Sequence, residues 1–408
     1  MTRLRALSLP LRDVVDDVPD LNDIARGDGY LFVRDRVGLA GRGAAARLAF
    51  DEAVACLDAI DHETSLPHAA PVAIGSVPFR PGSAATVVIP TVVVRKHHEH
   101  EPWVTAVVDA DAPLPSADDL AAELRLPPPA PPTAMGYRLR PGAPVEQYLG
   151  AVTAARDAVA RGELTKAVIA RPVIVEADAP IDVHAVLRRL RASFGSSYRY
   201  SIEGLVGASP ELLVEVEGAI VRSHPLAGTA PRTGDVDNDA RIAADLIAST
   251  KNQIEHRIVI DVVHDTLLPW ASYLDWEPEP SIVTVANVQH LGTRMEGRLS
   301  QPGPPVTELV RALTPTPALG GHPRQDAIDL IERVEGFERG RYGGAVGWVD
   351  ARGDGTWAVA IRCAELSDDR RRARLVAGGG IVAASDPHAE LAETQAKFQA
   401  MLSAIVRP

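Results

Sequence analysis

Three side chains near the C-terminus have types and spacings that could bind a cation together with an acid. Glu390, Glu393 and Lys397 lie at i, i+3 and i+7 of a segment that Asp386, as N-cap, and Pro387, in the first turn, predict to be helical. One helix face then presents two carboxylates and an ammonium. Such a face is either an ordinary solvated surface or one side of a site for a metal and a carboxylate.

A further carboxylate, Glu255, could complete such a site from a second helix. The segment from about Ala240 to Leu267 has helical periodicity, after a polar stretch, 232–239, that predicts a loop. Glu255 could pair with Lys251 one turn earlier, or its carboxylate could face a cation in a cleft. Mg²⁺ takes oxygen ligands and keeps waters, so carboxylates from two helices would suit a Mg²⁺ that also binds a carboxylate substrate. Glu255 lies beside the expected buried stripe, which consists of Ile254, Ile258 and Val262.

The stretch Gly207–Thr229 predicts a hairpin that carries polar residues where a packed hairpin should have none. Apolar residues alternate over Leu212–Val216, Glu217-Gly218 supplies a turn, and a partner strand follows. Ser209-Pro210-Glu211 puts a carboxylate at a strand start, where proline is tolerated. By itself this carboxylate is typical of a solvated strand edge. The small residues in 225–229 would let a ligand approach the backbone, which favours a site.

Two basic side chains fall in strands that are otherwise apolar. Lys166 lies near the start of the strand predicted over Leu164–Val175; it either extends to solvent or, if buried, favours the neutral amine that could act as a base. Arg362 lies in the strand predicted over Thr356–Cys363, where an arginine is usually paired with an anion from the protein or a ligand. The run Gly378-Gly379-Gly380 would free backbone N–H groups for an anion.

Two short segments, interrupted by proline or ended by glycine, predict loops that could line a pocket. Val283–Gly292 contains His290, and Leu313–Pro323 contains Ala318 and Leu319.

A histidine-rich tract, Arg95–Glu101, is the conspicuous feature of the first hundred residues. His97, His98 and His100 could ligate a transition metal. The tract also follows a predicted strand and precedes Pro102, as an exposed loop would. Both interpretations stay open.

Together these motifs resemble the chorismate-utilising enzymes, the family of isochorismate, salicylate, anthranilate and aminodeoxychorismate synthases. The resemblance covers roughly residues 140–405. It is carried by LTKAVIAR (164–171), GASPELL (207–213), SHPLAGT (223–229), KNQIEH (251–256), AVAIRCAEL (358–366), AGGGI (377–381) and ELAETQAK (390–397).

The resemblance implies a role for each matching side chain. Lys166 matches the general base and Glu211 the general acid of the family. Glu255 and Glu393 match ligands of Mg²⁺, and Glu390 a further acidic residue near the metal. The positions that match substrate-binding residues, or line the same implied pocket, are Gly228, Thr229, His290, Ala318, Leu319, Tyr342, Arg362, Gly378 and Lys397. Asn252 departs from the family, because many relatives have Asp or Glu there.

Three positions indicate which member of the family the chain resembles. Aminating relatives usually carry Gln at the position of Lys166, and aminodeoxychorismate synthases usually carry Lys at the position of Ala227. Neither substitution is present, so water is the expected nucleophile and no glutaminase subunit is expected. The pair Ala318-Leu319 is similar to isochorismate synthases.

The activity that the resemblance implies is an Mg²⁺-dependent isomerase, isochorismate synthase. It would convert chorismate to isochorismate by attack of water at ring carbon 2 with loss of the carbon 4 hydroxyl, for siderophore or menaquinone synthesis. The alternatives are a salicylate synthase, which also eliminates pyruvate, and an aminating synthase subunit. The implied fold is α+β, a single large domain of two mainly antiparallel sheets with helices packed outside.

Composition excludes several other classes. The chain has 408 residues, 46% of them hydrophobic, and a net charge of −12, which argues against nucleic acid or an anionic membrane as the main partner. Cys56 and Cys363 suggest no disulfide framework, which fits a reducing cytoplasm. The N-terminus has too few apolar residues for a signal segment, and no run approaches a membrane span. A monomer is expected.

The chain is predicted to have an N-terminal α+β subdomain over residues 1–126 and a catalytic region over 137–408. The proline-rich stretch 127–136, which is stiff and extended, is the predicted connector.

Overall fold

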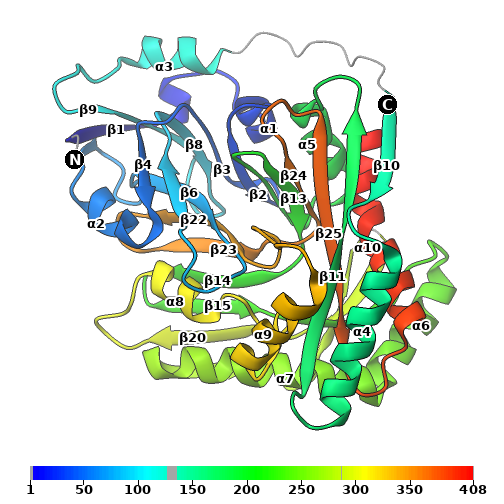
Figure 1. The fold of residues 1–408 in the computed structure, drawn as a ribbon. Helices are drawn as coiled ribbons and strands as arrows, with labels where there is room; N and C mark the ends of the chain where they lie inside the picture. The colour runs from blue at the N-terminus through cyan, green and yellow to red at the C-terminus, as the bar shows by residue number, and fades with distance from the viewer. Residues whose placement is uncertain (1–2, 126–135, 286, 408) are drawn as a thin grey trace.

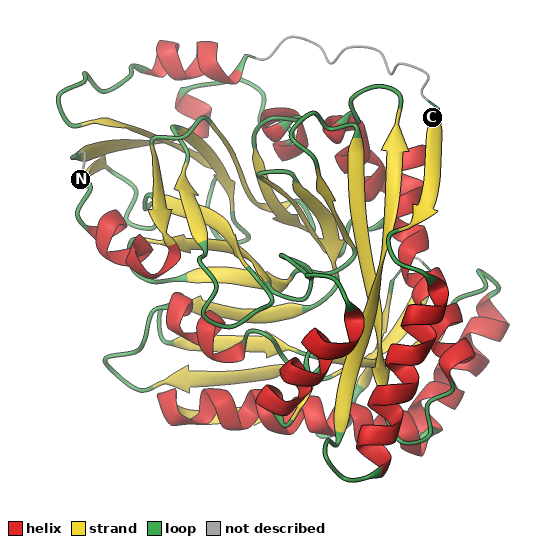
Figure 2. Cartoon of the chain, in the orientation of Figure 1, coloured by secondary structure: helices red, strands yellow, loops and turns green. Residues whose placement is uncertain are grey.

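The chain folds into two large β-sheets, a small third sheet and surrounding helices (Figure 1). A computed structural model describes residues 3–125, 136–285 and 287–407. Within these residues all strand pairs are antiparallel except β1 with β5. The helices lie mainly on the outside of the sheets (Figure 2). The predicted α+β class with two mainly antiparallel sheets is therefore confirmed.

The large sheet, called sheet A, has the order β10 (Tyr137–Pro141), β11 (Lys166–Ala177), β25 (Arg372–Ile381), β24 (Cys363–Leu366), β13 (Leu205–Ser209), β12 (Tyr198–Ile202), β2 (Tyr30–Arg34), β3 (Val37–Arg42), β8 (Val92–Lys96), β9 (Trp103–Asp109), β1 (Leu4–Pro10) and β5 (Asp61–Thr64), with β21 (Gly321–His322) added to β11. Sheet B has the order β17 (Ala271–Trp276), β20 (Met295–Leu299), β15 (Ile220–His224), β14 (Leu212–Glu217), β23 (Gly355–Val359), β22 (Ala345–Asp350), β6 (Val72–Val77), β7 (Thr86–Ile89) and β4 (Ala46–Ala49). Sheet C consists of β16 (Leu226–Pro231), β19 (Val288–Gly292) and β18 (Ser281–Thr284).

The described α-helices are α1 (Leu21–Ala25), α2 (Ala53–Asp58), α3 (Ala117–Leu124), α4 (Val145–Ala160), α5 (Val183–Ser193), α6 (Val236–Ala248), α7 (Thr250–Leu267), α8 (Val306–Leu313), α9 (Arg324–Glu335) and α10 (Pro387–Val406). Helices α4 and α9 pack on β11, α10 packs on β25, and α7 packs on β16. These helices cover the strands that carry the candidate site.

Strands from both ends of the chain share the same sheets. In sheet A, β2 pairs with β12, and in sheet B, β6 pairs with β22. The predicted connector lies outside the described residues except for Gly136, and the predicted division at residue 126 stays a prediction.

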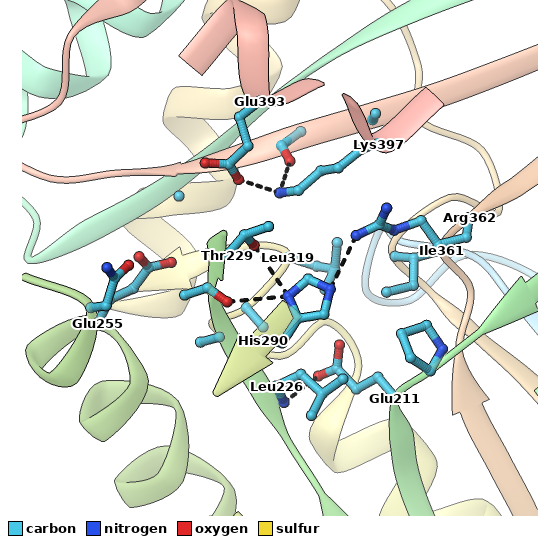
Figure 3. Close-up of a pocket in the computed structure, with 18 of the residues that line it drawn as sticks. Glu211, Leu226, Thr229, Glu255, His290, Leu319, Ile361, Arg362, Glu393 and Lys397 are labelled. Carbon is cyan, nitrogen blue, oxygen red and sulfur yellow. Dashed lines mark hydrogen bonds and ion pairs between the residues drawn. The ribbon is translucent and has the colours of Figure 1, made fainter. Parts of the chain in front are cut away.

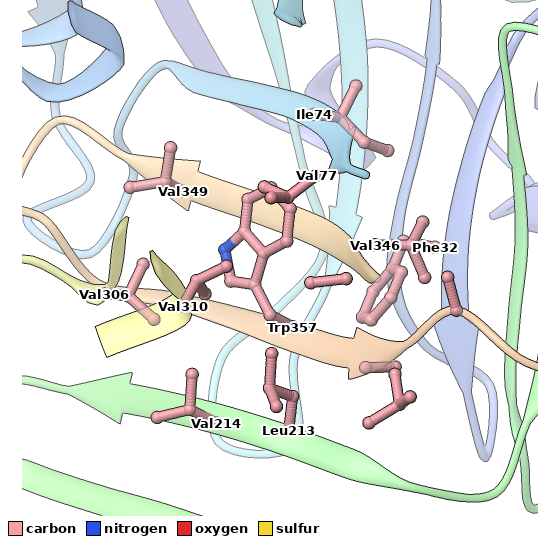
Figure 4. Packing of buried hydrophobic residues seen from close by; sticks show 14 of the residues in the cluster. Phe32, Ile74, Val77, Leu213, Val214, Val306, Val310, Val346, Val349 and Trp357 are labelled. Atoms are coloured by element: carbon pink, nitrogen blue, oxygen red, sulfur yellow. The ribbon is translucent and has the colours of Figure 1, made fainter. Parts of the chain in front are cut away.

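The largest hydrophobic core fills the space between sheets A and B. Trp357 on β23 is fully buried there, with its ring edge-on to Phe50 at a centroid distance of 5.2 Å. Figure 4 shows Trp357 surrounded by side chains of β6, β14, β22 and α8. A second core lies between sheet A and helices α5 and α10. Apolar burial of this extent is the main force that holds the two sheets face to face.

Two of the crossings between the large sheets are neighbours in space. Pro210-Glu211 joins β13 in sheet A to β14 in sheet B, and residues 360–362 join β23 in sheet B to β24 in sheet A. The crossings are hydrogen-bonded to each other's strands: the Val359 N–H donates to the Glu211 carbonyl at 3.1 Å, and the Ala208 N–H to the Arg362 carbonyl at 3.1 Å.

The predicted strand over Thr356–Cys363 is therefore wrong at its end. Arg362 lies between two strands, with φ of 51°, because the chain turns there to enter the other sheet. The predicted two-stranded hairpin in 207–229 is likewise only the β14–β15 part of four strands that belong to three sheets.

The helix predicted from Ala240 to Leu267 is two helices. Ser249 separates them, and its side chain caps the second by accepting a hydrogen bond from Asn252 N–H. The first, α6, begins at Val236, inside the stretch predicted to be a loop, because Asp235 caps it.

The predicted buried stripe of α7 is also wrong. Ile254 is 57% exposed, whereas Glu255, Val259, Ile260 and Val263 are buried. Apolar residues occur on both sides of this helix, so hydrophobic periodicity alone did not define its orientation. The helix is rotated by one position, which directs Glu255 inward.

Candidate active site

One pocket gathers every predicted site residue except Glu390. The walls come from β11 and β25 of sheet A, from the crossings at 210–211 and 360–362, from sheet C, and from helices α7 and α10 (Figure 3). The predicted residues that line it are Lys166, Glu211, Gly228, Thr229, Glu255, His290, Ala318, Leu319, Tyr342, Arg362, Gly378, Glu393 and Lys397. Asn252, Lys251 and Ile361 also line it, although no role was predicted for Lys251 or Ile361.

Lys166 is the first residue of β11 and is buried, with 1% of its surface exposed. The expectation that it would extend to solvent is therefore wrong. Its Nζ atom lies 2.9 Å from Oε1 of Glu255. The alternative partner of Glu255, Lys251, instead lies 3.6 Å from Glu390, so the predicted pair along helix α7 does not form. The rotation of α7 is what brings Glu255 to Lys166.

Glu211 is a carboxyl group held in an apolar and enclosed place. It is 2% exposed, and the Leu226 N–H is the group that donates to its Oε1, at 3.5 Å. Burial raises the pKa of Glu211 to about 8, against the opposing effects of that N–H and of the charges on Lys166 and Arg362. At neutral pH this side chain is therefore mainly a protonated carboxyl that can give up a proton.

Arg362 presents an unused donor to the pocket. Its Nη2 donates to Nε2 of His290 at 3.2 Å, while its Nη1 is buried without a hydrogen-bond partner. Since Nε2 accepts, Nδ1 of His290 carries the proton and donates to the Gly228 carbonyl at 3.1 Å. Burial lowers the pKa of His290 to about 3, so the ring is neutral and adds no charge. The open donor of Arg362 suits a carboxylate ligand.

His290 is on strand β19, where the sequence predicted a loop. Strand β19 pairs with β16, and Thr229 Oγ1 lies 3.2 Å from Nδ1 of His290. Figure 3 shows this ring between Thr229 and Arg362. The small sheet C thus fixes the orientation of the guanidinium.

The glycine run 378–380 gives room for carboxylates. It lies within strand β25, where Gly378, Gly379 and Gly380 are paired with residues 168–170 of β11. A Cβ atom at Gly380 would lie 2.3 Å from Oε1 of Glu255, and one at Gly379 would lie 2.5 Å from Oε2 of Glu390. Any side chain on these residues would displace the acids.

Three carboxylates approach this glycine strand from two helices. Oε1 of Glu393 would be 3.8 Å from the same Gly379 Cβ, and Oε2 of Glu390 is buried without a partner. Burial and the charge of Glu393 raise the pKa of Glu390. Among the described residues, no three His, Cys, Asp or Glu side chains form a ready set of metal ligands. A Mg²⁺ ion that keeps waters needs only one or two carboxylates, so the residues present fit such an ion.

Lys397 spans the same region. Its Nζ lies 2.6 Å from Oε1 of Glu393 and donates to the Gly378 carbonyl at 2.7 Å. The face of α10 that carries Glu393 and Lys397 is thus directed at the pocket and not at solvent.

A buried ion pair that the sequence did not indicate supports two walls of the pocket. Arg339 donates from Nη1 to the Leu319 carbonyl at 2.7 Å and from Nη2 to the Val168 carbonyl at 2.6 Å. Its partner Glu335 accepts from the Ala170 N–H at 2.6 Å. The pair therefore ties the Leu319 loop to strand β11, which begins at Lys166. The sequence shows that Glu335 and Arg339 are four residues apart at the end of α9, but many exposed ion pairs have the same spacing.

Comparison with known proteins assigns the family. Residues 46–406 match the family model described as "Chorismate binding enzyme". A Mycobacterium tuberculosis protein assigned provisionally as isochorismate synthase MenF is 42% identical over 349 residues, which are 82% of this chain and 87% of that protein. Isochorismate synthase DhbC of Bacillus subtilis is 39% identical over 280 residues, 66% of this chain and 70% of that protein. The chain belongs to the chorismate binding enzyme family.

A solved structure agrees over nearly the whole chain. The crystal structure of DhbC from Bacillus anthracis, assigned provisionally as a 2,3-dihydroxybenzoate-specific isochorismate synthase, has a TM-score of 0.76 and 30% identity. The match covers 97% of this chain and 99% of that one. The suspected resemblance to chorismate-utilising enzymes is thus confirmed. No helix in the described part of this chain is long and apolar enough to cross a membrane.

The Glu335–Arg339 pair generates a prediction about stability. Glu335→Leu removes the carboxylate and leaves a buried guanidinium without its counter-charge, so we expect a loss of about 3–5 kcal/mol in the free energy of unfolding. Urea denaturation of the full chain measures it. The double variant Glu335→Leu, Arg339→Met should lose less than the sum of the single variants.

Glu332 on the same helix provides a matched control. It pairs with Arg80 at 3.0 Å, but both side chains are exposed. Glu332→Leu should change the unfolding free energy by less than about 1 kcal/mol. Equal effects of Glu332→Leu and Glu335→Leu would contradict the proposed importance of the buried pair.

Proposed function

We propose that the chain is an isochorismate synthase, which converts chorismate to isochorismate. The observation that carries the proposal is that Lys166 and the protonated Glu211, from different elements, line one pocket in a member of this family. A base and an acid on one pocket suit a reaction that adds water at one ring carbon and removes hydroxyl from another. The relatives named isochorismate synthase support the same assignment.

The open donor of Arg362 would hold one carboxylate of the substrate. Its Nη1 has no partner, and Tyr342, which is 5% exposed, lines the same part of the pocket. The enolpyruvyl carboxylate of chorismate would take this position. Ala318 and Leu319 would provide an apolar wall beside the ring. Fixed contacts of this kind align the ring with the acid and the base before reaction.

In the proposed step Lys166, as the neutral amine, takes a proton from water as its oxygen bonds to ring carbon 2. The double bonds shift, the bond from carbon 4 to its hydroxyl breaks, and Glu211 protonates that hydroxyl, which leaves as water. One water enters and one leaves, so the reaction is an isomerisation. Lys166 then holds one extra proton and Glu211 has lost one, and exchange with solvent restores both.

The carboxylates of Glu255 and Glu393, with Glu390 nearby, would hold the Mg²⁺ ion. The ion would supply a positive charge that anchors the ring carboxylate of the substrate. In its absence these carboxylates are balanced by ammonium groups, Glu255 by Lys166 and Glu393 by Lys397.

The residues that line the pocket argue against an aminating activity. Ala227, where aminodeoxychorismate synthases usually carry Lys, is small and lines the pocket. Lys166 stands where aminating relatives usually carry Gln. We therefore propose water as the nucleophile and a chain that needs no glutaminase partner. The alternative salicylate synthase would release pyruvate from the same intermediate. Synthesis of a siderophore or of menaquinone would be the use of the product, and the match to a 2,3-dihydroxybenzoate-specific relative supports the first.

One incubation tests the activity and the two catalytic roles. With chorismate and Mg²⁺, we expect isochorismate as the product separated by chromatography, with neither pyruvate nor ammonium-dependent product. Lys166→Ala and Glu211→Gln should each lower kcat by about 10²-fold or more, because each removes one acid or base. Circular dichroism checks that both variants fold. Substantial turnover by either variant contradicts its assigned role, and salicylate with pyruvate would favour the alternative.

The raised pKa of Glu211 predicts loss of activity in alkali. The acid must be protonated, so kcat/KM should fall by about tenfold per pH unit above about pH 8. A constant kcat/KM up to pH 10 would contradict Glu211 as the acid. The pH dependence of thermal stability can assign this titration to Glu211. In the folded state the Glu211 carboxyl keeps its proton, whereas in the unfolded chain it releases the proton above its ordinary pKa of 4.5. The stability of the unmodified chain relative to Glu211→Gln is therefore highest below pH 4.5 and is lost as pH rises through about 8.

Removal of divalent ions should abolish turnover, and Mg²⁺ should restore it. Glu393→Gln and Glu255→Ala should each raise the Mg²⁺ concentration for half-maximal activity by more than about tenfold, as loss of a ligand requires. Calorimetric titration of Mg²⁺ into the inactive Lys166→Ala variant in the presence of chorismate compares Mg²⁺ binding with and without each of these substitutions, in the absence of turnover. Glu332→Gln, an exposed acid on α9, is the control. Full activity after dialysis against EDTA would exclude the metal role.

A further inference from the structure

Glu390 is the predicted site residue that does not line the active-site pocket, and one of its two oxygens is unpaired. The side chain lies on α10 and is 4% exposed. Its Oε1 lies 3.6 Å from Nζ of Lys251, and the Ser385 hydroxyl is near enough to lower the pKa of the carboxyl against the effect of burial. Its Oε2, however, is buried without a hydrogen-bond partner. Buried carboxylate oxygens normally accept a hydrogen bond, so Oε2 lacks a donor that the fold would be expected to provide.

Tyr148 on helix α4 carries a buried donor without an acceptor. Its side chain is 3% exposed, and its hydroxyl has no hydrogen-bond partner. The ring packs in the hydrophobic cluster between α4, α9 and β11, together with Ile169. Phenylalanine would fill this apolar place equally well, and a buried tyrosine hydroxyl usually has a partner. The hydroxyl is therefore a polar group whose use the cluster itself does not explain.

The two unpaired groups lie on the same face of sheet A. Ile169 of β11, which packs with Tyr148, is paired directly with Gly379 of β25. Directly opposite residues project to one face of a sheet, and the Cβ atom that Gly379 lacks would lie 2.5 Å from Oε2 of Glu390. Helices α4 and α10 pack on this face and contact each other (Figure 1). The donor and the acceptor thus come from two helices that meet over one pair of strands.

A buried cation joins the same contact. Nε of Arg171 donates to Oγ1 of Thr394, one turn after Glu390 on α10, at 2.8 Å, and the central carbon of its guanidinium lies 5.9 Å from the ring centroid of Tyr148. Burial, and after it the charge of Glu390, raises the pKa of Tyr148. The hydroxyl therefore keeps its proton and stays a donor, and the carboxylate lies within the range of its electrostatic interaction.

We propose that Tyr148 is a positioning residue of the metal site: its hydroxyl donates a hydrogen bond to Oε2 of Glu390 and so holds Oε1 toward the pocket when Mg²⁺ is bound. Carboxylates at protein metal sites are themselves oriented by hydrogen bonds, and loss of such a bond weakens metal binding. Tyr148 is not among the residues that line the pocket, so it acts through Glu390. The inference rests on the proposed function, in which Glu390 lies beside the ion.

Tyr148→Phe tests the role, because it removes the hydroxyl and keeps the ring. Mg²⁺ is titrated by calorimetry, in the presence of chorismate, into the Lys166→Ala chain with and without this substitution. We expect the dissociation constant of Mg²⁺ to rise by about tenfold or more. At saturating Mg²⁺, Tyr148→Phe in the otherwise unmodified chain should keep kcat and the KM for chorismate within about twofold. An unchanged affinity for Mg²⁺ would overturn the proposal.

Two comparisons distinguish positioning from a purely structural role. In EDTA, the urea midpoint of Tyr148→Phe should not fall below that of the unmodified chain, because the hydroxyl has no hydrogen bond to lose. In a Glu390→Ala background, which keeps Glu255 and Glu393, Tyr148→Phe should change the Mg²⁺ affinity by less than about twofold, since its acceptor is gone. A lower midpoint in EDTA, or the same tenfold effect without Glu390, would show a structural role and overturn the proposal.

Tyr198→Phe is the matched control. Tyr198 is 6% exposed, and its hydroxyl accepts a hydrogen bond from Nη1 of Arg34 at 3.0 Å. Its substitution should lower the urea midpoint and leave the Mg²⁺ affinity within about twofold, which is the reverse of the pattern for Tyr148→Phe. Equal losses of Mg²⁺ affinity in the two variants would overturn the specific role of Tyr148.

The unmodified Tyr148 chain separates this proposal from the proposed function. If the Lys166→Ala chain binds no Mg²⁺ in the presence of chorismate, the metal role in the proposed function is wrong, and the role of Tyr148 is wrong with it. If that chain binds Mg²⁺ and the Tyr148→Phe form binds it equally well, the metal role stands and the positioning role alone is wrong.

Discussion

The candidate active site depends on one constraint of the backbone: two of the points at which the chain changes sheets, 210–211 and 360–362, are neighbours. Glu211 lies on the first crossing and Arg362 on the second, and backbone hydrogen bonds join the strands around them. A strand inside a sheet directs side chains to its two faces, whereas a crossing directs them into the space between sheets. The acid and the anion-binding arginine are therefore neighbours because of topology, although 150 residues of sequence separate them.

Burial without complete pairing gives the pocket its chemistry. Glu211 is neutral because few polar groups reach it, and Arg362 has a free donor because His290 occupies only one of its nitrogens. Both features cost stability in the empty protein, since buried polar groups normally find partners. The surrounding structure compensates for this cost. The Glu335–Arg339 pair and the dense core around Trp357 are completely enclosed and hold the walls in place.

The sequence predicted the local elements better than their arrangement. The start of α10 at Asp386 and Pro387 and the turn at Glu217-Gly218 between β14 and β15 follow from short-range rules that need no knowledge of the fold. Strand partners do not follow in this way. Strand β23 pairs with β14 as far as Ala358 and ends at Val359, before Arg362. The period of two in a sequence identifies a strand but not its neighbours.

The site residues were found because several motifs had to agree, and the residues that no motif covers were missed. Lys166 and Glu255 were each named separately, but their contact required the rotation of α7, which apolar residues on both helix faces concealed. Arg339 and Glu335 were missed because only their burial distinguishes them from other charged pairs.

Arg95 is a further charged residue whose burial the sequence did not indicate. In the sequence it begins a run of charged and histidine residues that is typical of a solvated loop, and only the structure shows that its side chain is enclosed between Trp103 of β9 and Trp348 of β22. The candidate active site and a second cleft, lined by the histidine-rich tract, each contain a buried arginine, Arg362 in the first and Arg95 in the second, whose Nη1 atom has no hydrogen-bond partner. A buried guanidinium nitrogen without an acceptor costs stability, because buried polar groups normally find hydrogen-bond partners.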